Sequence, residues 1–123
     1  MKEHKIYIDN GEETEDLIQF LLNELSDAEI DNLEIDRKYD ETQSYAGEPL
    51  TTAALLGLAT TATIGIIRII ERWLEYKKQE RQIILVIEGF KQSDEAGKAV
   101  SKLAENNNKV SIEYKLTKKS DLK

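Results

Sequence analysis

The chain of 123 residues contains no cysteine, one histidine, one tryptophan and one proline. Without cysteine it can form no disulfide framework, no thiolate nucleophile and no cysteine-ligated metal site. The single histidine, His4, has no second histidine with which to build a zinc or transition-metal site. Glu88-Gly89-Phe90 supplies only one glycine after an apolar run, which is too few for a phosphate-binding loop. We therefore expect a protein that is not an enzyme and that binds no cofactor.

The net charge of −7 is distributed unevenly along the chain. Residues 1–48 hold 4 basic and 15 acidic side chains, whereas residues 49–123 hold 13 basic and 9 acidic ones. An acidic chain repels the phosphate backbone, and the basic half shows no interleaving of aromatic and basic residues. We therefore expect no nucleic-acid partner. The asymmetry fits either a head-to-tail contact between copies or ordinary solvated surface.

The first third of the chain predicts a strand, a helix and a second strand. Residues 5–9 (KIYID) are rich in strand-forming side chains. Apolar residues recur at spacings of three and four across residues 15–25, which predicts one helix with an apolar face. Residues 33–37 alternate as a half-buried strand does, and residues 38–48 are predicted to be a polar connector.

The last third predicts another strand, helix and strand. Residues 83–87 are an unbroken apolar run, typical of a central strand buried on both faces. Residues 93–105 fit a helix that begins near Ser93, and residues 110–116 alternate as a one-sided strand. The length fits one α+β domain over residues 1–123, in which two βαβ halves form a mixed four-stranded sheet with helices packed on it.

Between the two halves, the pattern predicts one long helix over residues 49–80. It begins at Pro49, which suits a first helical turn. Its roughly 32 residues would measure about 48 Å, whereas a small domain is about 30 Å across. Such a helix must protrude, pair with another copy or another protein, or enter a membrane.

Six residues of this predicted helix are candidates for an interaction surface. Four small residues spaced four apart would form a groove that accepts a neighbouring helix, and two aromatic residues follow near the basic end. The candidate residues are Ala53, Gly57, Thr61, Gly65, Trp73 and Tyr76.

A single-pass membrane protein is the alternative interpretation, with the span over residues 50–70. No charged residue occurs from Pro49 to Ile67, and basic residues follow this stretch. Against a span, its threonines dilute the hydrophobicity, and each separated half would keep only two strands. The N-terminus lacks the apolar core of a signal peptide, so we expect a cytoplasmic protein, with a membrane location as the alternative.

The pattern of elements resembles the effector-associated constant component family. The matching pieces are Ala46 to Pro49, the small-residue run 50–67, the segment Arg68 to Leu74 and the apolar strand Ile83 to Gly89. The helix-like segment 93–105 departs from this resemblance, which covers about residues 5–90 and carries no catalytic motif. Members of that family are small, non-enzymatic proteins encoded beside variable effectors in bacterial conflict systems.

The resemblance implies an adaptor that links an effector to its sensor. Together with the composition, it predicts a non-enzymatic protein that acts by protein–protein contact. The expected partner is an effector or signalling component, or a second copy of the chain.

Overall fold

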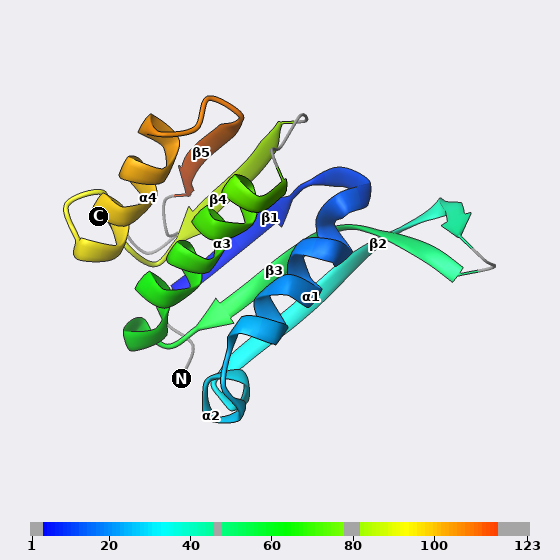
Figure 1. Ribbon diagram of the computed structural model, residues 1–123, viewed down its shortest axis with the longest axis horizontal. Coiled ribbons are helices and arrows are strands. Elements are labelled where there is room, and N and C mark those ends of the chain that lie inside the picture. The colour runs from blue at the N-terminus through cyan, green and yellow to red at the C-terminus, as the bar shows by residue number, and fades with distance from the viewer. Residues whose placement is uncertain (1–3, 46–47, 78–81, 116–123) are drawn as a thin grey trace, which may run out of the picture.

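The computed structural model describes residues 4–45, 48–77 and 82–115 as a sheet with helices on one face (Figure 1). The five strands are β1 (His4–Asp9), β2 (Leu33–Tyr45), β3 (Glu48–Leu58), β4 (Ile83–Glu88) and β5 (Val110–Lys115). Their order in the sheet is β2-β3-β1-β4-β5. All neighbouring strands are antiparallel except β4 and β5, which are parallel.

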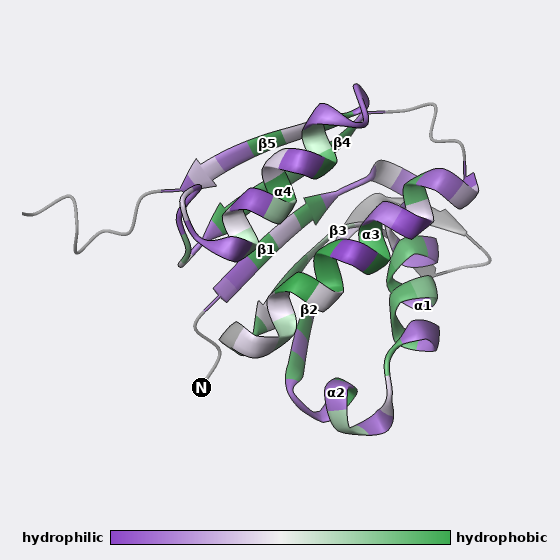
Figure 2. Ribbon diagram, turned by 60° about the vertical axis from the view of Figure 1, so that its left-hand side comes forward, coloured by the Kyte–Doolittle hydropathy of each residue, from purple (hydrophilic) through white to green (hydrophobic). Residues whose placement is uncertain are grey.

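The helices are α1 (Thr14–Glu24), α2 (Asp27–Asp31), α3 (Thr63–Lys77) and α4 (Glu95–Glu105). Short 3₁₀ turns, Gly11–Glu13 and Thr60–Ala62, precede α1 and α3. Figure 1 shows α1, α3 and α4 side by side over one face of the sheet. In Figure 2, hydrophobic and hydrophilic segments alternate along these helices, as expected for helices with one buried and one exposed side.

The connectivity from β1 to β4 is that of a ferredoxin-like fold. The order β-α-β-β-α-β with strands arranged β2-β3-β1-β4 is a split βαβ arrangement, in which β3 lies between the parallel strands β1 and β2. The α4–β5 unit extends this sheet on the β4 side through a parallel pairing. A fold of this kind hosts many functions, so the function has to be argued from particular surfaces.

The hydrophobic core lies between the sheet and the three helices. Ile6 and Ile8 of the central strand are each 1% exposed. Their paired neighbours on β3 and β4 point to the same face and are buried with them, as expected for residues directly opposite each other in a sheet. Helix α3 contributes the largest group of buried side chains, namely Ile66, Ile67, Ile69, Ile70, Trp73 and Leu74.

None of the helices in the described part of the chain covers the other side of the sheet, which we call the open face (Figure 1). The strand register places its side chains in three rows that cross the sheet from β2 to β5, with Asp9 placed beside Ala53 by continuing the β1–β3 register. The first row is Glu34, Gly57, Lys5, Glu88 and Lys115; the second is Asp36, Leu55, Tyr7, Val86 and Glu113; the third is Lys38, Ala53, Asp9, Ile84 and Ser111.

The predicted helix over residues 49–80 is wrong. Residues 48–58 form β3, a 3₁₀ turn follows at 60–62, and α3 begins only at Thr63 and is 15 residues long. A spacing of four residues is also a multiple of the two-residue period of a strand, so Ala53 and Gly57 share one face in either structure. The spacing therefore could not distinguish a strand from a helix, and pairing with β1 and β2 decides for the strand.

The predicted four-stranded sheet is also wrong, because the sheet has five strands. The additional strand is β3, which lies in the segment predicted to be helical. The predicted polar connector over residues 38–48 overlaps the outer part of a hairpin, since β2 continues to Tyr45 and β3 starts at Glu48. The pairing of β3 with β1 runs from Leu58 to Ala54, and the outer part of the hairpin is held by the pairing of β3 with β2. Figure 1 shows this outer part extending past the rest of the sheet.

The alternative interpretation, a membrane span over residues 50–70, is wrong for the same reason as the long helix. Its residues are divided between a strand, a 3₁₀ turn and the first half of α3. Within the described residues, no helix has the length and apolar character needed to cross a bilayer.

The second predicted βαβ unit is present, as β4, α4 and β5. The expectation that the run 83–87 is buried on both faces is wrong, however. Ile83, Leu85 and Ile87 are buried beneath the helices, while Ile84 and Val86 are only half-buried on the open face.

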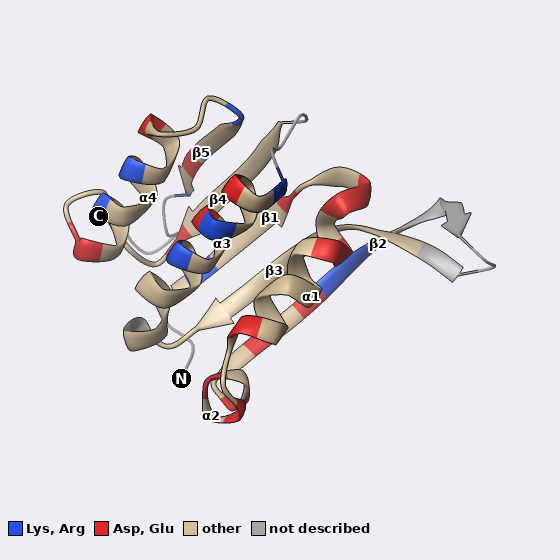
Figure 3. Cartoon of the chain, viewed as in Figure 1, with Lys and Arg blue, Asp and Glu red and all other residues tan. Residues whose placement is uncertain are grey.

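Some of the acidic residues of the first half form ion pairs with basic residues of the second half. Helices α1 and α2 carry acidic residues and no basic ones, while α3 carries both signs (Figure 3). Two ion pairs join the acidic first half to α3. Arg72 lies 2.8 Å from Glu24, and Lys77 lies 3.4 Å from Glu13.

Candidate protein-binding surface of helices α1 and α3

Three aromatic rings meet where the end of α3 lies beside α1. The Phe20 ring is centred 5.6 Å from the Trp73 ring at an angle of 58°, and 6.0 Å from the Tyr76 ring at an angle of 15°. Trp73 and Tyr76 are three residues apart on α3, so they lie on neighbouring turns of the same side. We call Phe20, Trp73, Tyr76 and the charged residues around them the aromatic surface.

Burial differs sharply between the three rings. Trp73 is 3% exposed and packs into the core, whereas Tyr76 is 74% exposed. Phe20 is half-buried and lies between them. The aromatic surface therefore rests on a buried tryptophan and presents an exposed tyrosine.

The indole N–H of Trp73 is buried and has no hydrogen-bond acceptor among the described residues. A buried donor without an acceptor costs about 1–3 kcal/mol. The ammonium of Lys77 lies 5.4 Å from the centre of the Trp73 ring, so a cation also borders the indole.

Charged side chains surround the aromatic residues. Arg72 donates a hydrogen bond of 2.8 Å to the carboxylate of Glu24, and Lys77 pairs with Glu13. A surface hollow of about 390 Å³ is lined by Phe20, Glu24, Arg72, Glu75 and Tyr76. An aromatic centre with charges of both signs at its margin is the composition typical of protein-binding surfaces.

The structure separates the six predicted interaction residues into different places. Ala53 and Gly57 are buried in β3 on the side of the open face. Thr61 is exposed in the 3₁₀ turn before α3, and Gly65 is exposed on α3, with open space where a Cβ would be. The helical groove predicted from these four residues does not form, because they lie on three different elements.

Trp73 and Tyr76 do lie together, and the structure adds Phe20 to them. Phe20 is not among the six residues predicted from the sequence. Its position among the apolar residues of 15–25, beside Leu17 and Leu21, was the available signal. Only the packing of α1 against α3 reveals that Phe20 faces Tyr76.

His4 lies in β1 and is only 8% exposed. Its Nδ1 is 2.8 Å from the hydroxyl of Thr63, and its ring is centred 4.6 Å from that of Phe90. Within the described part of the chain, no three acidic, histidine or cysteine side chains are grouped as metal ligands would be.

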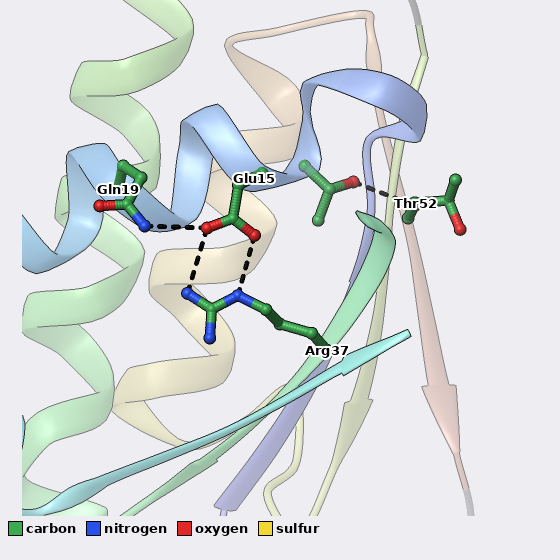
Figure 4. A network of polar contacts seen from close by, with 5 residues as sticks. Glu15, Gln19, Arg37 and Thr52 are labelled. Carbon is green, nitrogen blue, oxygen red and sulfur yellow. Dashed lines mark hydrogen bonds and ion pairs between the residues drawn. The ribbon is translucent and has the colours of Figure 1, made fainter. Parts of the chain in front are cut away.

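A network of polar side chains centred on Glu15 joins α1 to β2 (Figure 4). Arg37 donates two hydrogen bonds to the carboxylate of Glu15, of 2.8 and 3.1 Å, and Gln19 donates a third of 2.8 Å. Partial burial raises the pKa of Glu15, but the hydrogen bonds from Arg37 and Gln19 and the charge of Arg37 outweigh it and lower the pKa overall. The same contact raises the pKa of Arg37. This bidentate pair attaches the β2–β3 hairpin to the helical layer.

The fold and these surfaces define a ferredoxin-like α+β protein with an aromatic surface on its helical side and, on the other side, a sheet face that no described helix covers. Comparison with family models, with curated proteins and with solved structures finds no match to this chain.

Proposed function

We propose that this protein is a non-enzymatic adaptor that binds a protein partner through the aromatic surface of α1 and α3. The observation that carries the proposal is the position of Tyr76, which is 74% exposed yet stacked on Phe20 above the buried Trp73. A tyrosine held in place by a second ring presents a large contact area at a low entropic cost, as binding hot spots do.

The charges around the aromatic residues support the same role. Arg72, Glu24, Lys77 and Glu13 already pair within the chain. A partner that covers the tyrosine would meet charges of both signs around it, which favours specificity over raw affinity. The net charge of −7 makes a nucleic-acid partner a poor fit and leaves protein as the proposed class.

The non-enzymatic part of the proposal rests on the sequence. The chain has no cysteine, and its single histidine packs between Thr63 and Phe90. The partner class rests on the resemblance to the effector-associated constant component family, which points to an effector or its sensor in a bacterial conflict system. We propose the cytoplasm as the place of this activity.

The test uses purified full-length chain and the purified products of the genes encoded beside it. Binding of each product is measured by calorimetry with the wild type and with Tyr76→Ala. Loss of a hot-spot side chain costs about 2 kcal/mol or more, so we expect binding to weaken roughly 30-fold. The stability of the chain should change by less than about 0.5 kcal/mol, because Tyr76 is largely outside the core.

Tyr39→Ala is the matched control. Tyr39 is an exposed tyrosine too, at 54%, but it lies on β2, away from the aromatic surface. Binding that survives Tyr76→Ala unchanged would exclude the aromatic surface as the contact, whichever partner is found.

A further inference from the structure

Strand β4 has apolar residues at all five positions from Ile83 to Ile87. Such a run is typical of a strand that is covered on both faces, because a strand with one solvated face alternates with polar residues. Within the described chain only one face of β4 is covered, and Ile84 and Val86 remain half-buried on the open face. The sequence of β4 therefore fits an additional cover that the described residues of one chain do not supply.

The apolar residues of the open face gather at its centre. Leu55, Tyr7 and Val86 are neighbours in the second row, on three adjacent strands. A shallow hollow of about 410 Å³ lies over them, and Lys5, Glu88 and Lys115 of the first row complete its lining. The remaining charged side chains of the face lie around this centre, in the first and third rows and at the two edges.

We propose that the open face is covered by the open face of a second copy of this chain. The two sheets stack with a twofold axis that lies between them and runs across the strands, along the second row. This symmetry places the second row of one copy over its own equivalent. Leu55, Tyr7 and Val86 then meet the same residues of the second copy, and the first row of each copy faces the third row of the other.

Charge complementarity selects this axis. It places Glu34 opposite Lys38 of the second copy and Lys5 opposite Asp9 of the second copy, each twice by symmetry. It also sets Gly57 against Ala53 of the second copy, where two small residues allow close approach. A twofold axis along the strands would instead stack Lys5 on Lys5 and Asp9 on Asp9.

Two like-charge pairs remain at the edges of the face. Asp36 and Glu113 end the second row and would each face their own copy across the axis. Both side chains are exposed, and Asp36 is already paired with Lys38 of its own chain at 3.0 Å. At the solvated rim of an interface such repulsion is weak and is screened by salt.

The size of the face sets the area that the dimer can bury. Five strands about 4.8 Å apart and about six residues long cover about 24 by 20 Å. Two such faces bury about 1,000 Å² together, which is at the lower limit for a specific interface. The contact is therefore a small one, so its equilibrium has to be followed over a wide range of concentrations.

Dimerisation through the open face leaves the aromatic surface free. The helices lie on the opposite side of the sheet, so the two aromatic surfaces point away from each other (Figure 1). A dimer of this kind is a bivalent adaptor, and two linked partner sites raise the avidity for a multimeric partner. The interface itself does not depend on the proposed function.

The first test is sedimentation of the full-length chain over a wide range of concentrations. We expect a monomer–dimer equilibrium that Tyr7→Lys abolishes, because it places two ammonium groups opposite each other on the axis. Tyr76→Lys is the matched control on the helical side and should leave the equilibrium unchanged. A chain that stays monomeric throughout, or a dimer that Tyr7→Lys leaves intact, would overturn the proposal.

The second test does not depend on the core of the face, because Glu34 and Lys38 are both exposed. Glu34→Lys and Lys38→Glu each replace two attractive contacts by two repulsive ones, so each variant alone should dimerise about tenfold more weakly. Mixed together, the two variants should form a heterodimer that is stronger than the homodimer of either variant, since each charge then faces its opposite. It should stay weaker than wild type, because Lys38→Glu also removes the pair of Lys38 with Asp36 of the same chain. The double variant carrying both changes should also recover.

The combination of Glu34→Lys with Lys38→Glu distinguishes this dimer from any other contact made by the open face. Failure of the mixture and of the double variant to recover would refute the axis across the strands. The two proposals can fail separately. Tyr7→Lys should abolish dimerisation and leave partner binding normal, whereas Tyr76→Ala should weaken partner binding and leave dimerisation normal.

Discussion

Gly97, the third residue of α4, is the position where one added methyl group should destabilise the protein most clearly. It is buried against the loop that precedes the helix. A Cβ built there would collide with the carbonyl oxygen of Lys91 and lie 2.7 Å from the Cα of Gln92. Both contacts are with backbone atoms, which cannot rotate aside as a flexible side chain can. Either α4 or the loop must shift.

The net effect of Gly97→Ala combines two opposing contributions. Alanine is favoured over glycine in a helix by about 1 kcal/mol. Overpacking costs about 1–3 kcal/mol and occasionally more, and contact with the rigid backbone places this site at the high end. We expect a net loss of about 2 kcal/mol in the free energy of unfolding, or a melting temperature lower by roughly 10 °C. Urea titration followed by the fluorescence of Trp73 measures it.

Gly65→Ala is the matched control, because Gly65 is also the third residue of its helix. It is exposed, and a Cβ there meets nothing within 4 Å. Only the helix propensity applies, so this variant should gain about 0.5–1 kcal/mol. If Gly97→Ala stabilised the protein as Gly65→Ala should, the close approach of α4 to the loop would be refuted.

Three further outcomes follow from the polar contacts. Because the pKa of Glu15 is lowered from its ordinary value of 4.5, its pair with Arg37 stabilises the fold above that pH and loses this effect as the pH falls through the folded-state pKa. Glu15→Gln should therefore be less stable than wild type at pH 7, by under about 1 kcal/mol for so exposed a pair, and the difference should shrink as the pH is lowered below 4.5; equal urea midpoints at pH 7, or a difference that acid leaves unchanged, would contradict this. Thr14→Val removes a buried hydroxyl that accepts from the backbone of Asn10 and donates to the carbonyl of Thr52, each at 3.0 Å, and should cost about 1–3 kcal/mol in the same titration; Thr14→Ser, which keeps the hydroxyl, should lose less. Ser26→Ala removes the capping box of α2 and should speed amide exchange in that helix by an amount corresponding to about 1 kcal/mol, while α1 keeps its protection.

Elements with a strong local pattern could be predicted from the sequence. Helix α1 was expected over residues 15–25 and spans Thr14–Glu24, because its apolar residues recur on one face. The strand predicted over 5–9 from its strand-forming residues is β1, the one predicted over 83–87 from an apolar run is β4, and the one predicted over 110–116 from alternation is β5, with residue 116 outside the described residues. The helix predicted over 93–105 is α4. In each case the local preference and the final packing agree.

Strand β3 could not be predicted because its local pattern is ambiguous. Residues 53–58 (AALLGL) are apolar or small at every position, so neither a period of two nor one of 3.6 stands out. Pairing with β1 on one side and β2 on the other selects the strand, and both partners are distant in the sequence. The preference of the isolated segment is overridden by tertiary structure.

The candidate site was predictable only in part. Trp73 and Tyr76 stood out as aromatic residues near a basic helix end, and the structure places them together. Phe20 lies about fifty residues earlier, and its contact with Tyr76 depends on the docking of α1 beside α3. Nothing in the sequence pattern indicates which helices are neighbours.

The central place of β1 in the sheet also has a kinetic consequence. Its Ile6 pairs with Leu56 on one side and with Ile87 on the other, so both neighbours come at least fifty residues later in the chain. Contacts so distant in sequence close large loops and slow folding compared with helical bundles of the same size. During synthesis β1 leaves the ribosome long before either neighbour exists, and it stays unpaired until β3 and β4 follow. An unpaired strand with Ile6, Tyr7 and Ile8 exposed is a site for aggregation, so this protein should refold best at low concentration, and its yield should depend on how quickly the ribosome reaches β4.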